Sequence, residues 1–89
     1  MTYQYQFPAI ANPPSLSEQL AKIREECREV MEAYYGEETP ERVAEELIDL
    51  DHAKEQAIRR LEECGVDMDA VKAGVIAKNA ARGYYGEAK

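Results

Sequence analysis

Apolar residues recur at intervals of three and four along most of the chain, which is the spacing of amphipathic helices. In the first such segment they are Leu16, Leu20, Ile23, Cys27, Val30 and Tyr34. Ser15 and Glu18 have the spacing of a capping box, and Gly36 is placed to end the helix in the left-handed conformation. The pattern therefore predicts a helix that starts near Ser15 or Ser17 and ends before Gly36.

Two more helical segments follow after short links. Thr39 is placed as an N-cap with Pro40 at the first helical position. The stripe of this second helix continues, until Gly65, through Val43, Leu47, Leu50, Ala57 and Leu61. Asp67 is placed to cap a third helix, which Gly83 closes and which holds Val71, Val75 and Ile76. The expected fold class is all-α: an antiparallel bundle of about three main helices per protomer, completed by oligomerisation.

Residues 1–14 differ from the helical remainder, 15–89. They contain three aromatic side chains and three prolines and almost no charge. Prolines and the missing helical period predict an extended or irregular arm. We expect this arm to lie on the body or on a neighbouring subunit, the alternative being a loosely attached tail.

Composition and charge narrow the function classes. The chain has 89 residues, enough for one small domain, and a net charge of -7. Duplex nucleic acid is an unsuitable partner, because its binding relies on basic patches. No apolar run approaches the length of a membrane span. Two cysteines are too few for a disulfide scaffold. No charged-then-apolar signal segment opens the sequence, so a cytoplasmic location with reduced thiols is expected.

Acidic residues three apart occur on the first two helices. Glu26 and Glu29 lie on one flank of the first apolar stripe, and Glu46 and Asp49 lie on the matching flank of the second. A hairpin of the two helices can bring all four carboxylates together. Each pair about 4 Å apart would then repel by roughly 4 kcal/mol at an effective dielectric constant near 20. A divalent cation reverses that sign, and oxygen ligands favour Mg²⁺ or Mn²⁺. The alternative for any single acid is a solvated helix surface.

These acids also carry a resemblance to a known family. Glu25, Glu26 and Glu29, followed after 16 intervening residues by Glu46 and Asp49, resemble the EExxE…ExxD signature of the MazG-like, all-α nucleoside triphosphate pyrophosphohydrolases. The resemblance covers about residues 16–85. Its third element is the basic stretch of the following helix, to which Lys78, Asn79, Arg82 and Tyr84 are similar.

The resemblance implies hydrolysis of a nucleoside triphosphate to a monophosphate and pyrophosphate, as nucleotide-pool housekeeping. The residues that would hold Mg²⁺, with Mn²⁺ as a substitute, are Glu26, Glu29, Glu46 and Asp49. Glu25 and Glu45 look like supporting acids, and Glu25 stands close enough to share the catalytic role.

The same resemblance implies a substrate-binding set. Lys78 and Arg82 would grip the phosphates, Asn79 would bind sugar or phosphate, and Tyr84 is one of several tyrosines available for base stacking. Arg42 stands one turn before Glu46, where a phosphate contact and a plain ion pair with Glu46 are equally good interpretations.

Other functions and residues remain open. A non-catalytic helical module, either nucleotide-binding or regulatory, is the main alternative to an enzyme. Family members commonly have a further helix before the acidic one, so a homodimer or higher homo-oligomer is expected to complete the bundle. His52 is expected at a surface or interface away from the acidic flank. Cys27 and Cys64 are expected to pack rather than react.

Overall fold

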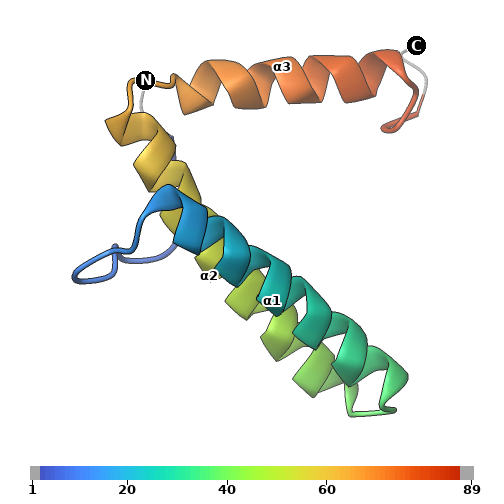
Figure 1. Ribbon diagram of the computed structural model, residues 1–89. Helices are drawn as coiled ribbons and strands as arrows, with labels where there is room; N and C mark the ends of the chain where they lie inside the picture. Colours follow the sequence, from blue (N-terminus) through green and yellow to red (C-terminus); the bar gives the residue numbers. More distant parts are fainter. Residues whose placement is uncertain (1–2, 87–89) are drawn as a thin grey trace.

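Three helices account for most of the chain in the computed structural model, which describes residues 3–86. They are α1 (Leu16–Tyr35), α2 (Pro40–Glu63) and α3 (Met68–Ala81), as drawn in Figure 1. No strand occurs within residues 3–86. The all-α class predicted from the sequence is confirmed. The outermost positions of the predicted arm and helical domain, 1–2 and 87–89, lie outside the described residues.

The helix starts follow local side-chain chemistry. The Ser15 hydroxyl accepts the backbone N–H of Glu18, and the Glu18 carboxylate accepts the backbone N–H of Ser15, both at 3.2 Å. Thr39 and Asp67 accept backbone N–H groups three residues ahead in the same way. The three predicted caps are confirmed because each depends on contacts within one turn.

The end of α1 differs from the prediction. Gly36 has φ of -80°, and the left-handed residue is Glu37, with φ of 59°. A Cβ at Gly36 would lie 2.8 Å from the carbonyl oxygen of Glu32. Glycine is therefore needed here for close approach rather than for a positive φ. Gly65, which follows α2, does adopt the left-handed conformation, with φ of 93°.

Helices α1 and α2 form an antiparallel hairpin (Figure 1). The seam between the two helices is narrow. The side chains buried in it are Gln19, Glu26 and Ala33 on α1 and Glu46, Ala53 and Ala57 on α2. Alanines let the two backbones approach closely. The seam runs beside the apolar stripes rather than through their centres, so Leu20 remains 54% exposed and Leu47 49% exposed. Cys27 is exposed as well, and so is Cys64 at the end of α2, in contrast to the packing expected for both.

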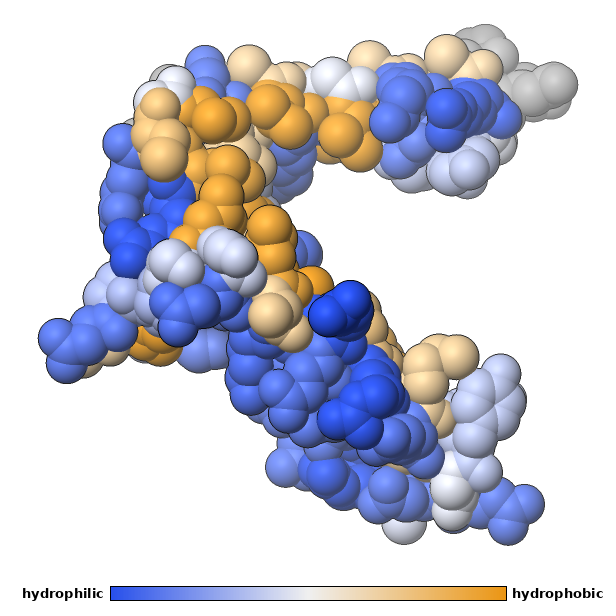
Figure 2. Space-filling model, viewed as in Figure 1, coloured by the Kyte–Doolittle hydropathy of each residue, from blue (hydrophilic) through white to orange (hydrophobic). Residues whose placement is uncertain are grey.

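Helix α3 leaves the hairpin instead of packing along it. It contacts α2 where the two are linked and, within residues 3–86, does not contact α1 (Figure 1). The radius of gyration is 15.6 Å, whereas a compact chain of this length has about 12 Å. Figure 2 shows apolar residues gathered where α2 and α3 meet, facing the angle between them. None of the described helices is long and apolar enough to cross a membrane.

The arm lies along the second half of α2, where helix side chains bind its backbone. The buried Glu55 carboxylate accepts the backbone N–H groups of Gln6 and Phe7 at 3.0 Å. The Gln56 amide donates to Pro8 O and accepts from Ile10 N. Further down α2, two arginines donate to arm carbonyls: Arg59 to Phe7, and Arg60 to Pro13 and Pro14. These contacts explain why α2 buries polar side chains facing the arm.

Candidate functional site

Three carboxylates from the two hairpin helices converge. Glu26 of α1 and Glu46 and Asp49 of α2 each place one oxygen within 4.8 Å of the others. The side chains of Glu26 and Glu46 are only 8% and 7% exposed, whereas Asp49 is exposed. The structure thus brings together three of the four acids that the sequence predicted as metal ligands.

Glu29, the fourth predicted ligand, lies beside this cluster. Its pKa is raised, first because a proton on Glu29 can be hydrogen-bonded to the Glu26 carboxylate, then by burial and by the charges of Glu26 and Glu46. A carboxyl group whose pKa is raised by neighbouring carboxylates lies closer to them than its charge favours. A cation placed among them would remove this repulsion.

The two buried glutamates of this cluster are each paired with a cation one turn before them on the same helix. Lys22 Nζ lies 3.0 Å from Glu26 Oε1, and Arg42 Nη2 lies 2.5 Å from Glu46 Oε1. The second oxygen of each glutamate, Oε2, is buried and has no hydrogen-bond partner among the described residues. Buried carboxylate oxygens are normally satisfied. Two unsatisfied oxygens on facing helices fit a site for a hard cation with oxygen ligands.

Arg42 is held by more than one acid. Besides Glu46, it contacts Glu45 at 3.1 Å and Glu38 at 3.6 Å. Its pKa is raised, first by the hydrogen bond to Glu45 and then by the charge of Glu46. The ion pair that the sequence offered for Arg42 and Glu46 is therefore present. Glu45 supports the cluster through Arg42, while Glu25 is exposed and stands outside the converging oxygens.

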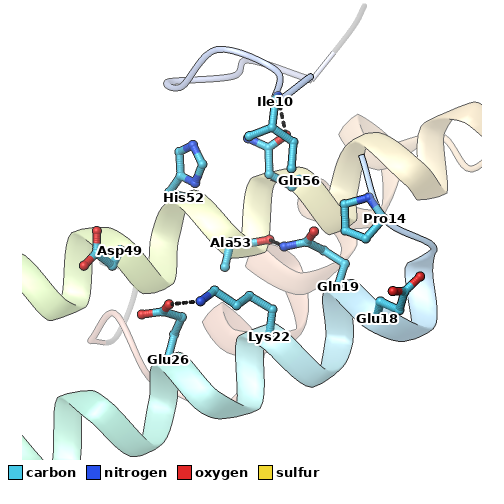
Figure 3. Close-up of a pocket in the computed structure, with 10 residues that line it drawn as sticks. All are labelled: Ile10, Pro14, Glu18, Gln19, Lys22, Glu26, Asp49, His52, Ala53 and Gln56. Atoms are coloured by element: carbon cyan, nitrogen blue, oxygen red, sulfur yellow. Dashed lines mark hydrogen bonds and ion pairs between the residues drawn. The ribbon is translucent and has the colours of Figure 1, made fainter. Parts of the chain in front are cut away.

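A cavity of about 520 Å³ adjoins the acids (Figure 3). It lies between the hairpin and the arm, with Glu26 and Asp49 at one end and Ile10 and Pro14 of the arm at the other. His52 also lines it, one turn after Asp49 on α2, with its ring 5.2 Å from that of Phe7. The expectation that His52 lies away from the acidic flank is wrong, because residues three apart on a helix are neighbours.

The predicted basic stretch is not brought to the acids within one chain. Lys78 and Asn79 lie in the second half of α3, Arg82 caps its end, and Tyr84 follows in the next turn. Since α3 leaves the hairpin, these side chains are separated from Glu26 and Glu46 (Figure 1). Arg42 is the predicted substrate-binding residue that the fold places at the cluster.

Sequence reasoning missed Lys22, Gln19 and Gln56. Lys22 stands four residues before Glu26, the same spacing that singled out Arg42 before Glu46, so the signal was present. The two glutamines gave no local signal, because Gln19 donates to Ala53 O across the seam and Gln56 binds the arm.

No protein-family model matches this chain, and no match to it was found among curated proteins or among solved structures.

Proposed function

We propose that the protein is a Mg²⁺-dependent nucleoside triphosphate pyrophosphohydrolase that releases a monophosphate and pyrophosphate. The observation that carries the proposal is the pair of buried oxygens of Glu26 and Glu46, beside the Asp49 carboxylate, that have no hydrogen-bond partner in the part of the chain that the structure describes. Buried charge is costly unless a counter-charge completes it. An oxygen-only donor set of this kind suits Mg²⁺ or Mn²⁺ better than zinc.

In this proposal the chain's own groups divide the work. Glu26, Glu29, Glu46 and Asp49 hold the cation. When bound, the cation stabilises charge on the phosphate oxygens and lowers the pKa of the attacking water. Arg42 lies beside Glu46, where its guanidinium can bind a phosphate group through two parallel hydrogen bonds.

The cavity beside the acids is the proposed nucleoside site. Its volume of about 520 Å³ falls in the range typical of small-molecule pockets. It opens next to Glu26 and Asp49, so that a nucleoside there would leave its phosphates at the acids. The arm residues Ile10 and Pro14 form an apolar wall against which a base can pack.

We further propose that the active form is a homodimer or a higher homo-oligomer. The chain exposes 6743 Å², while a compact monomer of 10.1 kDa exposes about 5,300 Å². The excess of about 1,400 Å² is more than the roughly 800 Å² that each partner covers in an ordinary stable interface. In such an assembly α3 of one chain can lie against the hairpin of another. Its Lys78, Asn79, Arg82 and Tyr84 then become available to the partner's substrate.

Pyrophosphate release tests the activity. The pure protein is incubated with Mg²⁺ and a panel of canonical and modified nucleoside triphosphates, with and without EDTA. We expect release that EDTA abolishes and that Glu46→Gln reduces by about 100-fold or more, because even outer-shell partners of metal sites cost about 10- to 100-fold. The control is Glu32→Gln, an exposed acid on α1 outside the cluster, which should retain activity.

Two results would change the conclusion. Turnover by Glu46→Gln at the wild-type rate would refute the assignment of the site. Nucleotide binding that raises the melting temperature without any pyrophosphate release would instead support a nucleotide-binding module.

A further inference from the structure

Lys22 and Arg42 occupy equivalent places on the two hairpin helices but are held differently. Each pairs with the glutamate four residues later, and each leaves the second oxygen of that glutamate unpartnered among the described residues. Arg42 has two further carboxylate partners, Glu45 and Glu38. If Glu46 turned to another cation, Arg42 would still be held in place. Lys22 has one carboxylate partner among the described residues, Glu26.

Lys22 is also free to move and has space to enter. Its side chain is 52% exposed, and it lines the cavity next to the acids, which Arg42 does not (Figure 3). An ammonium group has three donors, and one of them is directed to Glu26. Of the residues that line this cavity, Lys22 is the one with a permanent positive charge, and its pKa is raised further by the hydrogen bond that it donates to Glu26 and by the charge of that carboxylate.

A divalent cation at the second oxygen of Glu26, Oε2, would share the charge of that carboxylate with the ammonium of Lys22 at Oε1. Magnesium binds a carboxylate oxygen at about 2.0–2.1 Å. The Lys22 nitrogen already lies 3.0 Å from Glu26 Oε1. The cation and the Lys22 ammonium, both bound to the Glu26 carboxylate, would repel each other. The flexible, half-exposed lysine side chain is the group that can move away.

We propose that Lys22 is a phosphate-binding residue that exchanges partners: it neutralises Glu26 while the acids hold no divalent cation and turns to a substrate phosphate in the cavity once they do. This inference rests on the proposed function, because it takes the acids as the cation site and the cavity as the nucleotide site. Lys22 would then supply, next to the acids, the phosphate-binding cation that the basic residues of α3 do not supply within one chain.

The exchange predicts opposite effects of one substitution on two ligands. Lys22→Met keeps the aliphatic stem and removes the charge. Mn²⁺ alone, titrated by calorimetry, should bind this variant several-fold more tightly, because its competitor for Glu26 is gone. Inorganic tripolyphosphate, titrated in saturating Mg²⁺, should bind about tenfold or more weakly, which is the usual effect of losing a charged hydrogen bond.

Two further variants make the test specific. Lys22→Arg keeps the charge and should restore most of the tripolyphosphate affinity. Arg28→Met removes the cation of an exposed pair with the same four-residue spacing on the same helix, Arg28 to Glu32 at 2.6 Å, and should change neither titration. Helix content by circular dichroism verifies that each variant is folded.

The outcomes separate this inference from the proposed function. Unchanged Mn²⁺ affinity or unchanged tripolyphosphate affinity in Lys22→Met would overturn the exchange. A wild-type protein that binds neither probe would overturn both proposals. Binding of both probes without nucleotide hydrolysis would refute the enzyme assignment, while the two titrations would still decide the role of Lys22.

Discussion

Glu29 holds its proton to higher pH than an ordinary glutamate, because it shares a hydrogen bond with Glu26 and stands near a second charge on Glu46. In the unfolded chain its pKa returns to about 4.5. Between 4.5 and the raised pKa the folded protein therefore binds more protons than the unfolded chain. Its free energy of unfolding must fall as pH rises through that window. A divalent cation would offset this loss.

We accordingly expect Glu29→Gln to raise the melting temperature in EDTA above that window and to change it less below pH 4.5. The same variant should show a smaller rise than the wild type when Mg²⁺ or Mn²⁺ is added. Thermal unfolding followed from pH 4 to 7.5, at fixed ionic strength, measures both effects. Glu32→Gln is the control. A melting-temperature difference that is constant across the pH range would show that Glu29 is not repelled by its neighbours.

At the scale of elements, the arm and α2 are joined by polar contacts to the arm backbone. The Glu55 carboxylate is 3% exposed and accepts from two consecutive backbone N–H groups, those of Gln6 and Phe7. Tyr5 and Phe7 add contacts specific to a side chain: Tyr5 lies under the Arg59 guanidinium at 3.9 Å and donates to Glu62, and the Phe7 ring contacts that of His52. Burial, and then the hydrogen bond to Glu62, raise the pKa of Tyr5. With the arm held on α2, its residues Ile10 and Pro14 form a wall of the cavity.

We expect Glu55→Gln to lower the free energy of unfolding by about 1–3 kcal/mol, because a neutral amide oxygen replaces the charged acceptor of both N–H groups and an NH₂ group takes the place of Oε2, which also accepts from Gln6. Urea unfolding measures the change, and Glu32→Gln serves as the exposed control. Backbone amide exchange at Gln6 and Phe7 should quicken in Glu55→Gln. Unchanged exchange at both amides would mean that Glu55 does not hold the arm.

At the scale of the whole molecule, the single chain leaves apolar surface on both sides of the angle between α2 and α3 (Figure 2). On α3, Val71, Val75 and Ile76 are each more than 40% exposed. Exposed apolar surface of this extent is typical of interfaces. In the oligomer proposed above, a second copy of the chain would cover this surface.

Light scattering at micromolar concentration should therefore give at least twice the 10.1 kDa mass of one chain. Val75→Glu should shift the protein toward the monomer, since it places a charge on the apolar side of α3. Ala77→Glu, two residues further, adds the same charge about 200° around the helix and should leave the mass unchanged. A wild-type mass near 10 kDa would refute the oligomer.

Local interactions are what the sequence determined by itself. The starts of all three helices depend on a cap and a donor three residues ahead, as in Ser15 with Glu18, and these were predicted correctly. The convergence of Glu26, Glu46 and Asp49 was also predictable, because acids three apart on matching flanks can meet in only a few hairpin geometries. Gly36 shows the limit of such rules: its neighbour Glu37 took the left-handed conformation instead.

Contacts between distant segments were decided only by the tertiary structure. The Gln19 side chain donates to the Ala53 carbonyl, and the Gln56 side chain binds the arm. Both contacts join residues more than 30 positions apart, and no local sequence pattern encodes such pairs. The apolar stripes fixed which faces would avoid water but not where along each stripe the helices would meet. Alanines at the seam allow close approach beside the stripes, which leaves Leu20 and Leu47 exposed. The direction of α3 was likewise not encoded locally. Helical periodicity specifies which face of α3 is apolar, but it does not specify which segment packs against that face.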